Sequence, residues 1–284
     1  MPRPHPVAVN ADAAAFLKWA GGKRRLLAQY QPFFPKTDSF GDYLEPFVGG
    51  GSVFFHVLGT LKPRRCHLFD GNHDLIETYQ AIKDSPEGVI TELTLLRGRH
   101  SEDHYYKVRA KVPATLVARA ARIIYLNKTC YNGLYRVNSQ GQFNVPIGRY
   151  VKVRIFDSEN VRAVSAALKK ASLECSDFRL VQKRANRNDF VYFDPPYDPV
   201  SNTANFTGYT STNFARAEQG ELAEIYRELD KRGCKLMLSN SDTPFVRELY
   251  KGFTLHPILA RRNINRSADK RGPVGEVLVV NYKP

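Results

Sequence analysis

Short apolar runs and longer amphipathic stretches alternate along most of the 284-residue chain. Runs with the length and composition of strands lie at residues 42–47, 65–70, 189–193, 235–239 and 276–282. Stretches with helical spacing lie at residues 52–58, 74–83 and 218–232. This alternation predicts an α/β fold built around one sheet.

The middle of the chain has a different pattern. Residues 85–125 are rich in Arg, Leu and Ala with helical periodicity and contain no clear strand. Residues 131–150 then carry Asn-Gly, Gln-Gly and Pro-Ile-Gly turn signals, which are typical of a hairpin with polar tips. We therefore expect one sheet domain in two parts, residues 1–72 and 158–284, interrupted by a mostly helical insertion at residues 73–157.

The charge of the chain indicates a polyanionic partner. The sequence has 42 Lys and Arg against 28 Asp and Glu, a net charge of +14, and the basic residues are spread along it. Nucleic acid is the commonest partner of so basic a protein, although solubility alone is an alternative. Residues 1–15 lack the apolar segment of a signal peptide, and no apolar run approaches the ~18 residues of a membrane span. We expect a cytoplasmic protein that does not bind membranes.

The cysteines give no sign of a metal site. Cys66, Cys130, Cys175 and Cys234 are too far apart in sequence to form a CxxC pair, so a zinc site is not expected. In a reducing cytoplasm we expect free thiols. We expect no metal cofactor.

A glycine-rich turn follows the first predicted strand. Residues 45–51 read Glu-Pro-Phe-Val-Gly-Gly-Gly and precede a predicted helix. Glycines there let the backbone approach a ligand, although the same sequence also suits a tight strand-to-helix connection. Asp70 ends the next predicted strand, where α/β folds hydrogen-bond a ribose, and Asp is also a common helix N-cap. Together these features favour a ribose-containing ligand at this edge of the sheet.

The Asp-Pro-Pro-Tyr sequence at residues 194–197 is a more specific signal, because it directly follows a predicted buried strand. Two prolines end the strand and stiffen the loop, so that the Asp194 carboxylate and the Pro195 carbonyl can point at one spot. Tyr197 supplies a flat face beside them. A plain surface turn is the alternative, since Asp-Pro is a frequent turn pair. A rigid pair of acceptors beside an aromatic ring suits an amino group on a flat ring.

Such a pair of acceptors would make a poor nucleophile reactive. The lone pair of the adenine N6 amino group is delocalised into the ring. Asp194 and the Pro195 carbonyl can hold both N–H groups, localise the lone pair and stabilise the positive charge that develops as a sulfonium methyl arrives. Tyr197 would stack on the base and fix its position. The loop therefore predicts methyl transfer to a ring amino group.

Residues 16–23, which read FLKWAGGK, place an aromatic ring, a glycine pair and two lysines within a short span. A lysine can meet the carboxylate of a cofactor, and Trp19 can pack on the cofactor's apolar parts. The alternative is a core tryptophan with solvated lysines.

Residues 125–136, continuing to 144–150, interleave aromatic residues with Asn and Arg near a turn. Arg136 can pair with a guanine edge, and Tyr131 or Asn132 can fill the gap left by an extruded base. The alternative is a polar hairpin that covers the helical insertion.

In combination, these motifs resemble the Dam-type, or D12 class, DNA adenine methyltransferases over nearly the whole chain. The matching segments, in the order of the family, are residues 16–23, 45–54, 70–72, 125–136, 143–150, 194–197, 203–206 and 238–243. The resemblance implies a Rossmann-like, S-adenosylmethionine-dependent methyltransferase fold with a helical target-recognition insertion. It also implies transfer of a methyl group to N6 of a flipped adenine in double-stranded DNA, within GATC or a related short site.

The resemblance assigns roles by position. The expected cofactor contacts are Trp19, Lys23, Glu45, Phe47, Gly49, Asp70 and Asp194. The expected catalytic residues are Asp194, Pro195, Pro196 and Tyr197. Lys18, Leu134 and Arg136 match positions that read flanking bases, and Tyr131 and Asn132 match residues inserted beside the target. Arg261, Arg262 and Arg266 lie in a basic stretch that suits phosphate contacts.

The chain departs from the family pattern outside the Asp-Pro-Pro-Tyr sequence. It has Asp-Gly-Asn at residues 70–72 where Asp-Ile-Asn is frequent, and Val137 where relatives commonly carry Tyr. The hairpin tip at residues 139–142 is also its own. These departures bear on which DNA sequence is recognised.

Three alternatives stay open at this stage. The first is an N4-cytosine DNA methyltransferase, which would usually have Ser in place of Asp194. The second is methylation of RNA or of a protein glutamine; protein glutamine enzymes favour Asn-Pro-Pro-Tyr, and the positive charge suits nucleic acid better. A DNA-binding module with an inactive methyltransferase fold is opposed by the presence of Asp194, Asp70 and Lys23. We expect a monomer that associates with the nucleoid through DNA.

Overall fold

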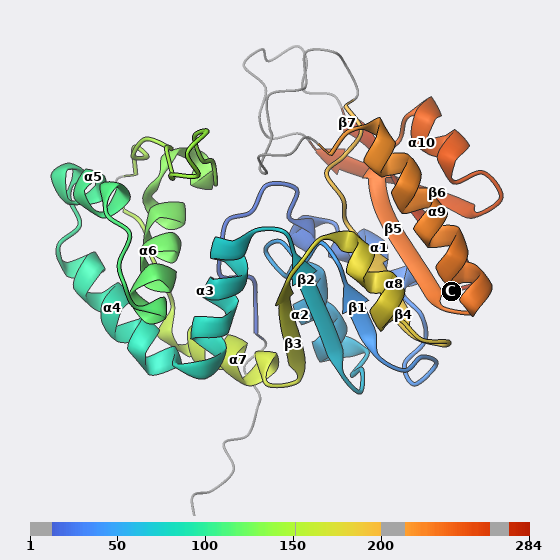
Figure 1. The fold of residues 1–284 in the computed structure, drawn as a ribbon, viewed down its shortest axis with the longest axis horizontal. Helices are drawn as coiled ribbons and strands as arrows, with labels where there is room; N and C mark the ends of the chain where they lie inside the picture. The colour runs from blue at the N-terminus through green and yellow to red at the C-terminus, as the bar shows by residue number, and fades with distance from the viewer. Residues whose placement is uncertain (1–12, 151, 200–213, 262–272) are drawn as a thin grey trace, which may run out of the picture.

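The computed structural model describes residues 13–150, 152–199, 214–261 and 273–284. Its strands form one sheet in the order β3-β2-β1-β4-β5-β7-β6 (Figure 1). The strands are β1 Tyr43–Glu45, β2 Cys66–Asp70, β3 Ala171–Cys175, β4 Phe190–Phe193, β5 Lys235–Ser241, β6 Thr254–Arg261 and β7 Pro273–Val280. Strands β1 to β5 pair in parallel, and β7 lies antiparallel between β5 and β6.

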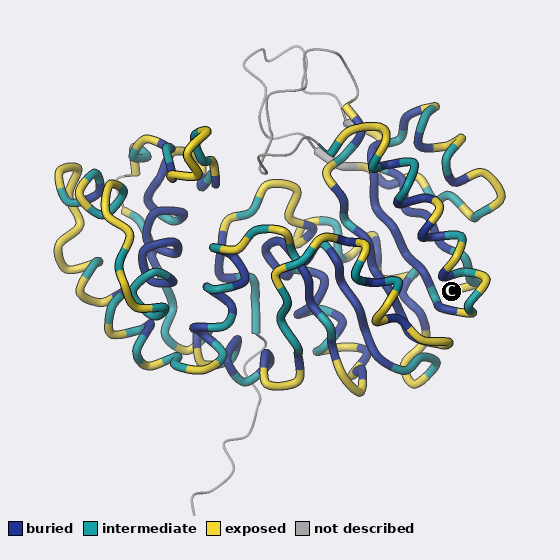
Figure 2. Tube along the Cα trace, in the orientation of Figure 1, coloured by how far each residue is buried: buried dark blue, intermediate teal, exposed yellow. Residues whose placement is uncertain are grey.

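The central strands are buried on both faces of the sheet. In β4, Phe190 and Tyr192 belong to one hydrophobic cluster, whereas Val191 and Phe193 belong to the other. A largely parallel sheet covered on both faces needs continuous apolar strands rather than alternating ones. The apolar run is therefore fully buried as β4, and Figure 2 shows the central strands mostly in the dark blue of buried residues.

Helices cover both faces of the sheet. The α-helices are α1 Leu27–Tyr30, α2 Ser52–Thr60, α3 His73–Asp84, α4 Pro86–Gly98, α5 Glu102–Ala110, α6 Leu116–Thr129, α7 Ser158–Leu168, α8 Val181–Arg184, α9 Arg216–Arg232 and α10 Pro244–Leu249. Short 3-10 helices are η1 Lys23–Arg25, η2 Gln31–Phe33, η3 Tyr131–Gly133 and η4 Phe178–Leu180. Buried residues of α2, α3 and α7 share one hydrophobic cluster, and those of α8, α9 and α10 share the other.

The segment between β2 and β3 contains helices α3 to α7 and lies on the left of Figure 1. Side-chain caps begin several of these helices: Asn72 accepts from the Leu75 N–H before α3, and Thr115 accepts from the Ala118 N–H before α6. Helix α6 packs against α3, α4 and α5. The division into residues 1–72, 73–157 and 158–284 stays a prediction.

The predicted α/β fold is confirmed, and each strand and helix expected from the sequence pattern is present within a few residues of its expected bounds. The hairpin expected at residues 131–150 has a different form. It contains the η3 turn and two isolated antiparallel bridges, Val137 with Phe143 and Cys130 with Ile147, instead of two strands. At its tip the Asn138 side chain accepts from the backbone N–H groups of Gln140 and Gln142. Local turn contacts rather than a strand ladder therefore order this segment.

Candidate active site

Three of the sites predicted from the sequence lie at the carboxyl ends of β1, β2 and β4. The chain leaves β1 for β2 and β3 on one side, whereas β4 leads to β5 on the other side. At such a reversal of strand order the loops diverge and leave a crevice for a ligand. The glycine turn (residues 46–51) follows β1, Asp70 ends β2, and the DPPY loop (residues 194–197) follows β4. Topology alone therefore places these three elements at one edge.

Trp19 lies directly against the glycine turn. Gly49 and Gly51 have φ angles of 48° and 69°, in the left-handed region that favours glycine. A Cβ atom on Gly49 would lie 2.9 Å from Trp19 Nε1, and one on Gly50 would lie 3.0 Å from Trp19 Cβ. The glycines are thus required by the close approach of the indole as well as by the backbone conformation.

Asp70 holds the glycine turn in place. Its Oδ2 accepts from the Gly49 N–H at 3.0 Å, and its Oδ1 accepts from the Asn72 N–H at 2.9 Å. Burial raises the pKa of Asp70, and these two N–H groups act in the opposite direction. Each carboxylate oxygen can accept a second hydrogen bond. Asp70 therefore has the capacity to accept from ribose hydroxyls while it supports the turn.

Glu45 and Phe47 lie on different sides of the turn. Glu45 is 2% exposed and accepts from the Tyr43 hydroxyl at 2.7 Å. Burial is the main cause that raises its pKa. The Phe47 ring is half-buried and stacks on Phe178 with ring centres 5.6 Å apart. Glu45 thus contacts a residue of one hydrophobic cluster, whereas Phe47 packs against the other cluster.

The Asp194 carboxylate is held through one oxygen. Its Oδ1 lies 2.8 Å from Lys23 Nζ and accepts from the Ser239 hydroxyl at 2.9 Å. Ser239 in turn contacts the Tyr192 hydroxyl at 2.8 Å. Burial raises the pKa of Asp194, while the Lys23 ammonium lowers it. Because both of these contacts are made by Oδ1, Oδ2 can accept from a substrate.

Lys23 joins the N-terminal motif, which comprises residues 16–23, to the DPPY loop. Its side chain is 3% exposed, and Nζ also donates to the Gly21 carbonyl. The same ammonium lies 4.7 Å from the centre of the Tyr197 ring. The Tyr197 hydroxyl donates to Glu276 Oε2 at 2.8 Å. Charged and aromatic groups from the motif, the DPPY loop and β7 therefore form one cluster.

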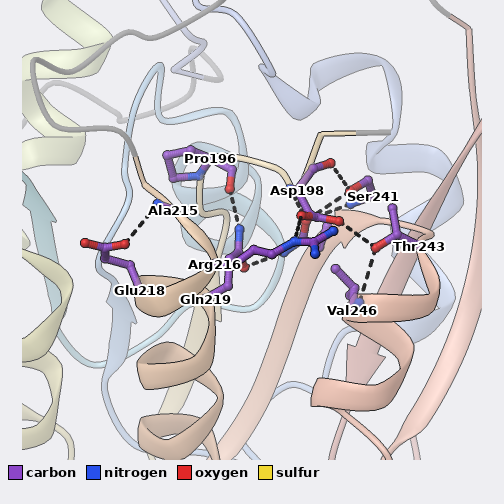
Figure 3. Close-up of polar contacts among 10 residues, drawn as sticks. Pro196, Asp198, Ala215, Arg216, Glu218, Gln219, Ser241, Thr243 and Val246 are labelled. Atoms are coloured by element: carbon purple, nitrogen blue, oxygen red, sulfur yellow. Dashed lines mark hydrogen bonds and ion pairs between the residues drawn. The ribbon is translucent and has the colours of Figure 1, made fainter. Parts of the chain in front are cut away.

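The backbone of the DPPY loop is braced from helix α9 and the end of β5 (Figure 3). Gln219 Nε2 donates to the Pro196 carbonyl at 2.7 Å. Asn240 donates to Gln219 Oε1 at 3.0 Å and accepts from the Asp198 N–H at 3.1 Å. A chain of side-chain amides therefore fixes the loop at residues on either side of Tyr197.

Asp198 extends this brace. Its Oδ2 accepts from the Thr243 hydroxyl at 2.9 Å, and its carbonyl accepts from the Ser241 hydroxyl at 2.6 Å (Figure 3). Oδ1 lies 3.6 Å from Arg216 Nε, whose side chain is 71% exposed. Since Asp198 itself is 3% exposed, most of its interactions are with buried hydroxyls. It fastens the loop to the turn before α10.

The residues expected to contact DNA lie on and around the reading turn, which comprises residues 131–136. Tyr131 is 53% exposed, and Asn132 is exposed with a φ angle of 54°. Arg136 is exposed and donates from Nε to Asn144 Oδ1 at 2.7 Å. Leu134 is half-buried. These positions present aromatic, amide and guanidinium groups from one short turn.

The remaining DNA candidates have separate positions. Lys18 is exposed, and its Nζ donates to the Tyr150 hydroxyl at 3.2 Å. A Cβ atom on Gly133 would lie 2.3 Å from Lys18 Cδ, so Lys18 packs against the reading turn. Arg261 is the last residue of β6. The other expected residues Arg262, Arg266 and 203–206 lie outside the described residues.

Asn127 ties the N-terminal motif to the reading turn. Its side chain accepts from the Lys18 N–H at 2.8 Å and donates to the Lys18 carbonyl at 2.8 Å. It also donates to the Gly133 carbonyl at 3.1 Å. The neighbouring Trp19 ring lies 5.6 Å from the ring of Tyr135. A single buried amide therefore connects the segment against the glycine turn with the turn expected to meet DNA.

Comparison with known proteins identifies the family. A family model described as "D12 class N6 adenine-specific DNA methyltransferase" matches residues 19–264. The chain belongs to this family. The Type II methyltransferase M.MjaIII of Methanocaldococcus jannaschii is 44% identical over 95% of this chain and 100% of its own length. The Type II methyltransferase M1.LlaDCHI of Lactococcus lactis is 41% identical over 94% of this chain and 95% of its own. The DNA adenine methylase of Escherichia coli is 38% identical over 95% of this chain and 95% of its own length.

Membership of the D12 class confirms the predicted family and the predicted kind of enzyme, an adenine-specific DNA methyltransferase. It names adenine rather than cytosine as the base, and DNA rather than RNA or protein as the substrate. Among the described residues, no group of three or more His, Cys, Asp or Glu could hold a metal ion. Within the same part of the chain, no helix has the length and apolar character needed to cross a membrane.

Several side chains of the candidate active site were not assigned a role from the sequence. Ser239 and Asn240 lie within residues 238–243, which the resemblance includes but to which it gave no role. Gln219 is the one buried polar side chain of the amphipathic helix α9, and Glu276 is the only acid in the predicted strand at 276–282. An isolated polar residue on an apolar face was the available signal in both cases.

Proposed function

We propose that this D12 enzyme transfers the methyl group of S-adenosylmethionine to N6 of an adenine flipped out of duplex DNA, within GATC or a related short site. One observation carries the proposal. The Asp194 carboxylate is held through Oδ1 by Lys23 and Ser239, beside the Tyr197 ring and at the sheet edge that carries the glycine turn. This arrangement leaves Oδ2 for an amino group of the substrate.

The residues at this edge fit S-adenosylmethionine. The glycine turn has no room for Cβ atoms beside Trp19, Asp70 has free acceptor capacity, and the buried Lys23 ammonium suits the cofactor carboxylate. When bound, the cofactor supplies an electrophilic methyl group on a sulfonium. The proposed cofactor site comprises Trp19, Lys23, Glu45, Phe47, Gly49, Asp70 and Asp194.

The DPPY loop would activate the amino group. Asp194 Oδ2 accepts one N6–H, and the Pro195 carbonyl accepts the other, which localises the nitrogen lone pair and stabilises its developing positive charge. Tyr197 stacks on the base and fixes its orientation, while Pro196 keeps the loop stiff. Because burial raises the pKa of Asp194, its carboxylate is a better acceptor for the N6 proton after methyl transfer.

The reading turn would contact DNA. We assign Lys18, Leu134 and Arg136 to flanking bases, and Tyr131 and Asn132 to the space left by the flipped adenine. The insertion at residues 73–157 then acts as the target-recognition domain. Arg261, Arg262 and Arg266 would contact phosphates, in keeping with the net charge of +14.

Removal of the Asp194 carboxylate tests the chemistry. We expect Asp194→Ala to lower kcat by about 10²-fold or more, because it deletes a preorganised acceptor at the reacting nitrogen, and to weaken cofactor binding only in part. Transfer of a tritiated methyl group to unmethylated plasmid DNA, followed by nucleoside analysis, measures both rate and product. Label in N4-methylcytosine, or full turnover by Asp194→Ala, would refute the proposal.

Replacement of Arg136 tests the reading turn. Arg136→Ala should relax the preference at one flanking position, with a loss of ~1–3 kcal/mol of discrimination, because a bidentate contact to guanine disappears. Methylation-sensitive sequencing of DNA from cells that express each variant gives the site preference. Arg65→Ala, a charge-matched change at an exposed residue before β2, should leave it unchanged. An identical preference in Arg136→Ala and wild type would exclude this role.

A further inference from the structure

Strand β7 carries one acidic residue, Glu276, in an otherwise apolar sequence. Residues 277–280 are 0% exposed, whereas Glu276 is half-buried. Its backbone is paired opposite Ser241 of β5 and opposite Ile258 of β6. A side chain on a strand with neighbours on both sides has a more precisely fixed origin than one on a loop. The backbone position of Glu276 is therefore fixed by the sheet, and its side chain contacts the DPPY loop.

The Glu276 carboxylate accepts from hydroxyl groups of the active site. Oε2 lies 2.8 Å from the Tyr197 hydroxyl and 3.5 Å from the Tyr30 hydroxyl. Burial raises the pKa of Glu276, and the Lys23 ammonium opposes this shift. Burial also holds the pKa of Tyr197 well above its usual value, so the phenol keeps its proton and acts as the donor. The shorter contact joins Glu276 to the aromatic residue of the DPPY loop.

Two side-chain amides fix the backbone around Tyr197, and neither of them contacts its ring. Gln219 holds the Pro196 carbonyl, and Asn240 holds the Asp198 N–H. These contacts leave rotation about the side-chain bonds of Tyr197 as the remaining freedom. A hydrogen bond at the far end of the ring fixes the direction of the ring axis. Because a phenolic O–H prefers to lie in the plane of its ring, the position of the acceptor also favours one ring plane. Since Lys23 Nζ lies 4.7 Å from the ring centre, a turned ring would also disturb the cation that pairs with Asp194.

We propose that Glu276 is a positioning residue for methyl transfer: its carboxylate holds the Tyr197 hydroxyl and so fixes the position of the ring on which the target adenine stacks. This inference rests on the proposed role of Tyr197 in the DPPY loop. Glu276 does not touch the substrate in this scheme. Its effect on the reaction passes through the phenolic hydroxyl, so the two side chains form one functional unit.

A double-mutant cycle tests this unit. Glu276→Ala and Tyr197→Phe should each lower kcat by about ten- to a hundredfold, while KM for DNA changes by less than about threefold, because misplacement of a reacting group lowers rate more than binding. Adding Glu276→Ala to Tyr197→Phe should cause no further loss. Glu276→Gln keeps an acceptor oxygen and should restore part of the rate. The assay is tritiated methyl transfer to unmethylated plasmid DNA at saturating cofactor.

Tyr250→Phe is the matched control, because it removes a buried tyrosine hydroxyl that has no hydrogen-bond partner among the described residues, and it should keep kcat close to wild type. Equal losses from Glu276→Ala in the wild-type and Tyr197→Phe backgrounds would overturn the proposal. So would an unchanged kcat in Tyr197→Phe, a result that does not depend on the folding of Glu276→Ala. A wild-type enzyme that labels adenine N6 separates either outcome from failure of the proposed function.

Discussion

The protonation state of a single residue, Asp194, decides whether its Oδ2 can accept a hydrogen bond from the proposed substrate. A neutral carboxyl group would present a donor where the amino group of the substrate needs an acceptor. Burial raises the pKa of Asp194, and the Lys23 ammonium 2.8 Å away lowers it. The ion pair therefore keeps the carboxylate ionised over a wider range of pH than burial alone would permit.

Lys23→Met should shift the acidic limb of the kcat profile to higher pH. Without the cation, burial acts unopposed and the pKa of Asp194 rises further, so the carboxylate becomes protonated at a higher pH. The loss of kcat should be largest at low pH and smallest at high pH, measured at saturating cofactor. Lys23→Arg keeps the charge and should keep the position of the limb. An acidic limb that stays in place in Lys23→Met would show that Lys23 does not control this ionisation.

Sequence reasoning predicted Lys23 and Asp194 separately but not their contact with each other. The residues are far apart in the chain, and the FLKWAGGK motif by itself fits a core tryptophan with solvated lysines. Only the fold shows that Lys23 is 3% exposed and paired. Glu276 is a similar case, because its partner Tyr197 is defined by how β7 inserts beside β5, and no local pattern encodes that insertion.

Among the elements, the two strands that the sequence pattern missed are the edges of the sheet. Strand β3 is only partly buried along its length, so it lacks the continuous apolar run of a central strand. Strand β6 contains Pro257, which weakens a strand pattern but is tolerated where one side of the strand has no partner. Central strands were predictable because both of their faces are buried, which requires a continuous apolar run. Edge strands were not predictable, because an edge position tolerates polar residues and proline.

The segment after the DPPY loop owes its position to Asp198. Asp198→Ala should lower the free energy of unfolding by ~1–3 kcal/mol, because the buried Thr243 hydroxyl loses its acceptor. Asp198→Asn keeps an acceptor and loses only the charge facing the exposed Arg216, which should cost less than ~1 kcal/mol. Urea unfolding of both variants measures the difference. Equal losses would mean that the ion pair with Arg216, and not the buried hydroxyl contact, stabilises the loop.

At the scale of the whole molecule, the proposed cofactor and DNA sites share one structural connection. Trp19 packs on the glycine turn. The Asn127 side chain hydrogen-bonds the N–H and the carbonyl of the preceding residue, Lys18, and it also donates to the Gly133 carbonyl in the reading turn. Two sites joined through one hydrogen-bonded side chain can influence each other's affinity, and such an influence must be reciprocal. The helical insertion is thus connected to the sheet through a specific contact as well as through shared hydrophobic packing.

Asn127→Ala should weaken this coupling. Asn127 is 1% exposed, and its loss leaves three backbone groups without their partner, at a cost of ~1–3 kcal/mol or more. We expect wild-type protein to bind duplex DNA more tightly with S-adenosylhomocysteine than without it, and this ratio to fall toward one in Asn127→Ala. Titration of fluorescent DNA with and without S-adenosylhomocysteine gives the ratio. Asn138→Ala removes side-chain contacts to Gln140 and Gln142 at the hairpin tip and should keep it. A wild-type ratio in Asn127→Ala would show that the two sites communicate by another route, or not at all.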